Sequence, residues 1–123
     1  MKHRVKPKRL GRYKAGLWAE GIAANYLRFK GYQIIERRYK TPGGEIDLIA
    51  RRRKHFAFVE VKYRQALDEA KFSLTDQQKR RINKAALFWL ARNEHRYESL
   101  SFDVIVMAPW CWPLHIKSAF DEM

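Results

Sequence analysis

The sequence predicts a mixed α/β domain, in which a β-sheet is flanked by helices and the elements follow the order α-β-β-β-α-β-β. Three observations favour this fold class. Apolar residues recur at helical spacing in two segments, and short segments rich in β-branched and aromatic residues lie between and after them. Hydrophobic residues make up 46% of the 123 residues, which is enough for one packed core.

The chain begins with a strongly basic segment. Residues 1–14 contain seven lysines and arginines and no acid. We expect them to form a basic flexible arm that either contacts phosphates or has no function, and we expect residues 15–123 to form a single domain. Small and helix-forming residues over 15–30, with Gly31 as a stop, predict the first helix. Glu20 lies toward its inward side, either as a site residue or as a charge at the helix edge.

The remaining elements follow from local patterns. Residues 32–39 predict a strand, and residues 41–44 a turn. Residues 44–50 and 56–62 are joined by a short link and predict a β-hairpin. Residues 63–73 predict a loop, and Thr75 and Gln78 have the spacing of a capping box for a helix that reaches about Asn93. Residues 101–108 predict a buried strand, and residues 114–117 an edge strand.

The hairpin contains the residues that indicate chemistry. If its turn centres on residues 53 and 54, Asp47 lies opposite Glu60, and Glu45 lies opposite Lys62. Asp47 is embedded in an apolar run, and a buried unpaired carboxylate is unfavourable, so a cation, a metal or strong donors should lie beside it. Oxygen ligands of this kind suit Mg²⁺. The alternative is an exposed polar face whose ion pair contributes little.

Charge indicates the class of partner. The 26 lysines and arginines exceed the 13 acids and give a net charge of +13, which favours nucleic acid first and an anionic membrane second. No apolar run is long enough for a membrane-spanning helix, and no membrane partner is expected. The candidate nucleic-acid contacts are Arg51, Arg52, Arg53, Lys54, Lys79, Arg80 and Arg81. The alternative for each of them is a charge that is simply exposed to solvent. The single cysteine, Cys111, excludes an intramolecular disulfide and indicates a reducing compartment such as the cytoplasm.

Several short stretches together match a known pattern: Glu20-Gly21, Gly44-Glu45-Ile46-Asp47-Leu48-Ile49, Phe58-Val59-Glu60-Val61-Lys62 and Phe102-Asp103-Val104. With them the chain resembles the PD-(D/E)xK nuclease superfamily and, more closely, the YraN family of small bacterial proteins. The resemblance covers nearly everything after residue 14. It departs from the superfamily pattern where Ile46, in place of proline, precedes Asp47.

The resemblance implies a restriction-endonuclease-like fold, similar to that of archaeal Holliday-junction resolvases. It implies that Asp47, Glu60 and the backbone carbonyl of Val61 bind Mg²⁺, with Mn²⁺ as a substitute. By the same resemblance Glu20 completes the ligand set, and Lys62 assists the attacking water.

The leading hypothesis is therefore a Mg²⁺-dependent endonuclease that acts on DNA, in preference to RNA, and on a branched or structured form of it. Glu45 and Gln78 are expected at the rim of the site. The alternative is a non-catalytic nucleic-acid-binding module that retains the nuclease fold. Junction resolution needs two active sites, so a homodimer is one arrangement that the hypothesis allows.

Overall fold

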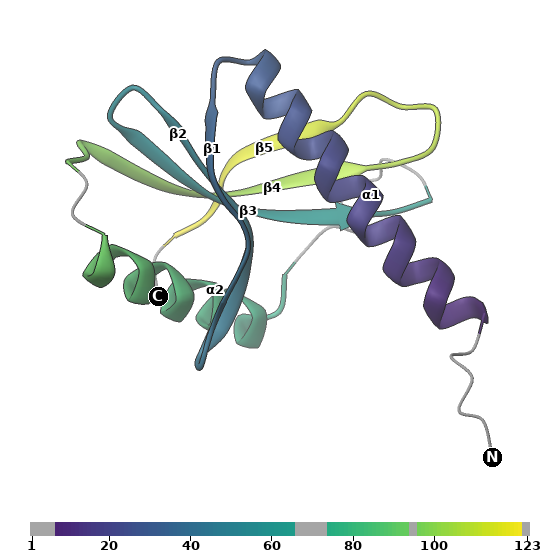
Figure 1. Cartoon of the computed structure of the whole chain (residues 1–123), viewed down its shortest axis with the longest axis horizontal. Helices are drawn as coiled ribbons and strands as arrows, with labels where there is room; N and C mark the ends of the chain where they lie inside the picture. The colour runs from purple at the N-terminus through teal and green to yellow at the C-terminus, as the bar shows by residue number, and fades with distance from the viewer. Residues whose placement is uncertain (1–6, 66–73, 94–95, 122–123) are drawn as a thin grey trace.

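A computed structural model describes residues 7–65, 74–93 and 96–121. Its elements, in chain order, are α1 (Pro7–Phe29), β1 (Gln33–Thr41), β2 (Gly44–Arg52), β3 (His55–Tyr63), α2 (Asp76–Arg92), β4 (Ser99–Met107) and β5 (Leu114–Phe120) (Figure 1). The predicted α/β class and the predicted element order are both confirmed. In the described part of the chain, neither helix is long and apolar enough to cross a membrane.

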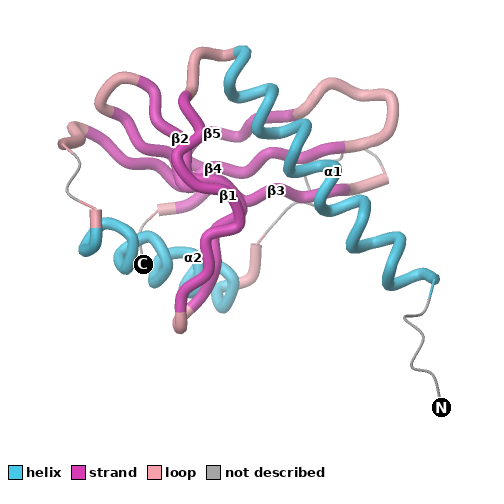
Figure 2. The backbone as a smooth tube through the Cα atoms, viewed as in Figure 1, coloured by secondary structure: helices cyan, strands magenta, loops and turns pink. Residues whose placement is uncertain are grey.

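The five strands form one mixed sheet in the order β1-β2-β3-β4-β5 (Figure 2). Neighbouring strands are antiparallel except β3 and β4, which are parallel and are connected through α2. A parallel pair needs such a crossover, whereas the antiparallel pairs are joined by short turns. The expected mixed sheet flanked by helices is therefore present.

The start of the first helix was predicted wrongly. The structure begins α1 at Pro7, whereas the sequence pattern placed the start at residue 15. The predicted arm over residues 1–14 therefore shares residues 7–14 with α1, and residues 1–6 lie outside the described residues.

The two helices bury opposite faces of the sheet. Ala23, Ala24 and Leu27 of α1 pack with Leu48 and Val59 in one core cluster. A second cluster forms around Trp89 of α2 and contains Phe56, Phe58 and Ile82 among others. The hairpin β2–β3 contributes to both clusters, so burial on its two faces fixes its register.

Local contacts set the positions of β2 and α2. The side chain of Thr75 accepts a hydrogen bond from the backbone N–H of Gln78, and the Gln78 side chain accepts one from the backbone of Thr75, which confirms the predicted capping box. At the start of β2, a Cβ on Gly44 would lie 2.1 Å from the carbonyl oxygen of Arg81. Only glycine allows this close approach, which brings the first turns of α2 next to the strand that carries Asp47.

Candidate functional site

The hairpin has the register that the sequence predicted. Its paired residues run from Arg52 opposite His55 to Leu48 opposite Val59. Continuing the same register by one residue places Asp47 opposite Glu60. At this point the backbone N–H of Val61 donates to Asp47 Oδ2 over 2.8 Å, so the Asp47 side chain bridges the two strands.

Asp47 and Glu60 form a carboxyl pair. Burial, the negative charge of Asp47 and a hydrogen bond between the two side chains raise the pKa of Glu60 to about 9. The ammonium of Lys62 opposes this rise. Without a metal, Glu60 is therefore protonated at neutral pH and donates the hydrogen bond to Asp47. A cation bound between these oxygens would replace that proton.

Glu20 lies next to this pair but has its own cation. The side chain is 13% exposed, and its Oε1 lies 3.8 Å from Nε of Arg38. This distance allows an ion pair but not a hydrogen bond, and among the described residues this buried oxygen has no hydrogen-bond partner. Burial and the charge of Asp47 raise the pKa of Glu20, while Arg38 and Arg37 lower it. The sequence left the role of Glu20 open, and the structure places it within electrostatic reach of Asp47.

The three predicted carboxylates do not form a closed ligand set. Within residues 7–65, 74–93 and 96–121, no group of three or more His, Cys, Asp or Glu side chains could hold a metal ion as arranged. Mg²⁺, however, is commonly bound through one or two carboxylates together with several waters. Asp47 and Glu60, with the neighbouring backbone of Val61, fit such a site. Oε1 of Glu20, which has no hydrogen-bond partner among the described residues, is a further oxygen within electrostatic reach of Asp47.

The residues predicted at the rim surround a pocket with Glu60. This pocket, which we call the Glu60 pocket, has a volume of about 220 Å³ and is lined by Glu45, Glu60, Gln78, Arg81 and Ile82. Helix α2 therefore brings a guanidinium group, that of Arg81, to the same hollow as two carboxyl groups. The guanidinium group would attract an anionic phosphate oxygen into the pocket.

The basic tip of the hairpin lies away from the Glu60 pocket. Asp47 and Arg52 are five residues apart on one strand, which corresponds to about 17 Å. At the tip, the guanidinium of Arg52 lies 4.7 Å from the centre of the Tyr32 ring, and Lys54 is paired with Glu98 at 3.4 Å. The predicted basic contacts therefore form two regions, the tip over residues 51–54 and the first turns of α2 with Lys79, Arg80 and Arg81.

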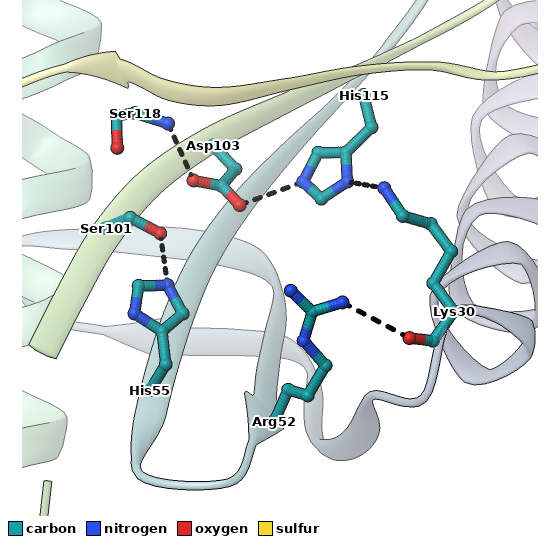
Figure 3. A network of polar contacts seen from close by, with 7 residues as sticks. All are labelled: Lys30, Arg52, His55, Ser101, Asp103, His115 and Ser118. Atoms are coloured by element: carbon teal, nitrogen blue, oxygen red, sulfur yellow. Dashed lines mark hydrogen bonds and ion pairs between the residues drawn. The ribbon is translucent and has the colours of Figure 1, made fainter.

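The sequence analysis missed a buried polar network on β4 (Figure 3). Asp103 is 1% exposed; its Oδ2 accepts from Nε2 of His115 over 2.9 Å, and its Oδ1 accepts from the backbone N–H of Ser118 over 3.0 Å. Nζ of Lys30, at the end of α1, lies 2.6 Å from the other ring nitrogen of His115. Burial raises the pKa of Asp103, but the hydrogen bonds from His115, Ser118 and Ser101 outweigh it, so the pKa is lowered overall. The network fastens β5 and the end of α1 to the sheet, and the only sequence signal for it was a carboxylate inside a buried strand.

The fold and the hairpin define a small mixed α/β protein with an acidic pair and a lysine on adjacent strands. The chain belongs to the family described as uncharacterised protein family UPF0102, whose model matches residues 19–107. This is the YraN family, so the resemblance to that family noted in the sequence is confirmed.

Three relatives illustrate the similarity, and each is named as a UPF0102 protein. The chain is 48% identical over 120 residues to one from Rhodopseudomonas palustris (strain BisB18), covering 97% of this chain and 89% of the relative. It is 48% identical over 116 residues to one from Bradyrhizobium diazoefficiens, covering 94% and 87%. A relative from Nitrobacter winogradskyi is 49% identical over 114 residues, covering 92% and 97%.

Proposed function

We propose that this protein is a Mg²⁺-dependent endonuclease that hydrolyses phosphodiester bonds in DNA. The observation that carries the proposal is the Asp47–Glu60 carboxyl pair, which lies beside Lys62 and under a pocket that also contains Arg81. A net charge of +13 supports a polyanionic substrate. A buried acidic pair adds nothing to phosphate binding unless a cation occupies it, and this favours catalysis over simple binding.

The residues have distinct roles in this proposal. Asp47, Glu60 and the carbonyl of Val61 hold the ion, and the oxygen of Glu20 joins them directly or through water. Bound Mg²⁺ supplies Lewis-acid polarisation of the scissile phosphate and a water of lowered pKa. Lys62 lies two residues from Glu60 in β3, on the same face, where its ammonium orients the attacking water.

The remaining roles concern the substrate. Arg81 meets the phosphate at the pocket, and Lys79, Arg80 and the hairpin tip hold the backbone on either side without reading sequence. We propose DNA in preference to RNA, and a branched or structured form of it. Cutting both strands of a branched substrate needs two active sites, which a homodimer would supply and sedimentation would detect.

A cleavage panel tests the proposal. Single-stranded, flapped, branched and blunt double-stranded substrates are incubated with Mg²⁺, with Mn²⁺ or with a chelator. We expect metal-dependent cleavage by the native chain, and a loss of at least about a hundredfold in Asp47→Asn and in Lys62→Met, with nucleic-acid binding retained. Glu98→Gln, a carboxylate that is 74% exposed on its side chain and lies by the hairpin tip, is the matched control. Cleavage that persists in both site variants, or no cleavage of any form with either metal, would refute the proposal.

A second candidate is a nucleic-acid-binding module without catalysis. This candidate is favoured because the acidic residues of the site already have partners within the protein. Glu60 is hydrogen-bonded to Asp47, and Glu20 is paired with Arg38. Thermal unfolding with and without millimolar Mg²⁺ separates the two candidates, because an ion bound only to the folded state raises the melting temperature. Tight, salt-sensitive DNA binding without such a rise would favour the module.

A further inference from the structure

A second surface of the molecule is unusually aromatic. A groove between α1 and the loop that joins β4 to β5 has a volume of about 630 Å³, and its lining includes Trp18, Phe29, Met107, Trp110 and Trp112. The β4–β5 loop lies next to α1 (Figure 1). Of the seven large hydrophobic side chains that are exposed in the described residues, four line this groove, with exposures of 60% for Trp18, 90% for Phe29, 104% for Trp110 and 85% for Trp112. We call this surface the aromatic groove.

The turn at the groove holds one indole in solvent. The backbone N–H of Cys111 donates to the carbonyl of Ala108 over 3.3 Å, and Pro109 occupies the second position of this turn. Trp110 occupies the third position with a φ of 62°. This is the left-handed region, which glycine adopts readily and bulky residues rarely do. Trp110 thus occupies a backbone conformation that glycine adopts with the least strain, and its exposed ring contributes nothing to the core.

The aromatic groove opens at the same end of the sheet as the candidate active site. Because β3 and β4 are parallel, Tyr63 pairs with Met107, and the backbone N–H of Arg64 donates to the carbonyl of Met107 over 2.8 Å. Met107 lines the groove, and Lys62 directly precedes Tyr63. On α1, Trp18 and Glu20 are two residues apart. The Glu60 pocket is lined from α2 and the aromatic groove from α1, which cover opposite faces of the sheet. A nucleic acid that occupies both sites therefore has to pass around this end of the sheet.

We propose that the aromatic groove binds the unpaired bases of a single-stranded segment, such as a flap, next to the phosphate to be cut. The placement relative to the cut rests on the proposed nuclease function; the binding itself does not. Aromatic side chains stack on any base, so they bind single strands without reading sequence, whereas bases in a duplex are already stacked. A chain with a net charge of +13 attracts a polyanion, and this favours a nucleic acid over an apolar partner such as a second copy of the chain.

Binding measured in the presence of a chelator tests the proposal independently of cleavage. The probes are a single-stranded oligonucleotide, a blunt duplex and the same duplex with a single-stranded flap, followed by anisotropy and by quenching of tryptophan fluorescence. Three of the four tryptophans line the groove, so quenching reports on it directly. We expect the flapped duplex and the single strand to bind at least about tenfold more tightly than the blunt duplex at equal salt, and to quench the fluorescence.

The decisive variant is Trp110→Gly. Because glycine suits the positive φ, the variant should melt at the same temperature or higher, so a loss of binding cannot come from misfolding. We expect it to lose most of the preference for unpaired strands and to keep its affinity for the blunt duplex. Trp112→Phe should retain the preference and Trp112→Ala should reduce it. Leu87→Ala, which removes another exposed apolar side chain, on α2, is the matched control and should change neither.

Each outcome separates the two proposals. If the native chain binds unpaired strands no more tightly than blunt duplex, or if Trp110→Gly binds them equally well, the groove proposal is overturned even where duplex cleavage persists. If Trp110→Gly loses single-strand binding while no substrate is ever cut, the groove proposal holds and the nuclease proposal fails. If the variant instead abolishes self-association and leaves nucleic-acid binding unchanged, the groove is an interface between two copies of the chain.

Discussion

The proton on Glu60 makes the stability of the metal-free protein depend on pH. Its pKa is raised from 4.5 to about 9, first by burial and then by Asp47. The folded chain therefore keeps a proton that the unfolded chain releases. The associated stability is fully present below pH 4.5 and is lost as the pH rises toward 9. Over the two units between pH 6 and pH 8, the free energy of unfolding of the native chain therefore changes by about 3 kcal/mol.

The variant Glu60→Gln removes this titration and keeps a hydrogen-bond donor for Asp47. We expect the native chain to lose roughly 10 °C more in melting temperature than the variant between pH 6 and pH 8, because 1 kcal/mol corresponds to roughly 4 °C in a domain of this size. At pH 8 the variant should be the more stable of the two. The measurement is thermal unfolding followed by circular dichroism, with a chelator present.

Glu45→Gln is the matched control for this experiment. Glu45 lines the same pocket and loses the same charge, but it is exposed and makes the smallest of the contributions that raise the pKa of Glu60. Its replacement should therefore keep most of the pH dependence of the native chain. Parallel curves for the native chain and Glu60→Gln would show that Glu60 is ionised in the folded protein. That result would refute the buried, hydrogen-bonded pair from which the metal site is argued.

Four further predictions concern the metal, the close approach at Gly44, the network around Asp103 and the effect of salt on DNA binding. In the proposed metal site Mg²⁺ would have to displace the proton of Glu60, so any stabilisation by Mg²⁺ should be larger at pH 8 than at pH 6, which melting at both values with and without Mg²⁺ measures. Gly44→Ala should lower the free energy of unfolding by about 2–4 kcal/mol in chemical denaturation, because its Cβ would lie 2.1 Å from the carbonyl oxygen of Arg81, whereas Gly16→Ala, with nothing within 4 Å, should raise it by up to about 1 kcal/mol. Asp103→Asn should cost about 2–4 kcal/mol at pH 7, and the difference from the native chain should shrink at pH 3, because the lowered pKa of Asp103 gives stability that is lost as the pH falls below its ordinary value. DNA binding that involves about four phosphate contacts should weaken about a hundredfold between 50 and 200 mM salt in a titration followed by anisotropy.

The sequence was a good guide wherever one local rule determines the structure. The hairpin register followed from a turn at residues 53 and 54 and from the need to bury both faces, and the structure has it from Arg52 to Leu48. The capping box of Thr75 and Gln78 was equally local. The start of α1 did not follow from a local rule. The basic residues after Pro7 show no apolar periodicity, which favours an arm over a helix, but lysine and arginine are good helix formers.

Contacts between distant segments could not be predicted. A carboxylate in a buried strand requires partners, but the pattern does not say that Asp103 finds His115, or that His115 meets Lys30 across 85 residues of sequence. The pairing of Glu20 with Arg38 was hidden for another reason. Arg38 has a positive φ of 53°, which strand periodicity does not predict, and this conformation determines where its guanidinium lies.

Protons and cations compete for the same carboxylates, and this competition distinguishes the two candidate functions. In the metal-free protein, the acids at this end of the sheet are neutralised by a proton on Glu60 and by the guanidinium of Arg38 beside Glu20. If the protein only binds nucleic acid, the double variant Asp47→Asn with Glu60→Gln should be more stable at pH 8 and should bind DNA as before, with or without Mg²⁺. If the protein is a nuclease, the same variant should also gain stability without metal, but it should lose both the response to Mg²⁺ and the cleavage. If Mg²⁺ raises the melting temperature of the native chain but not that of the double variant, this buried pair is a metal site.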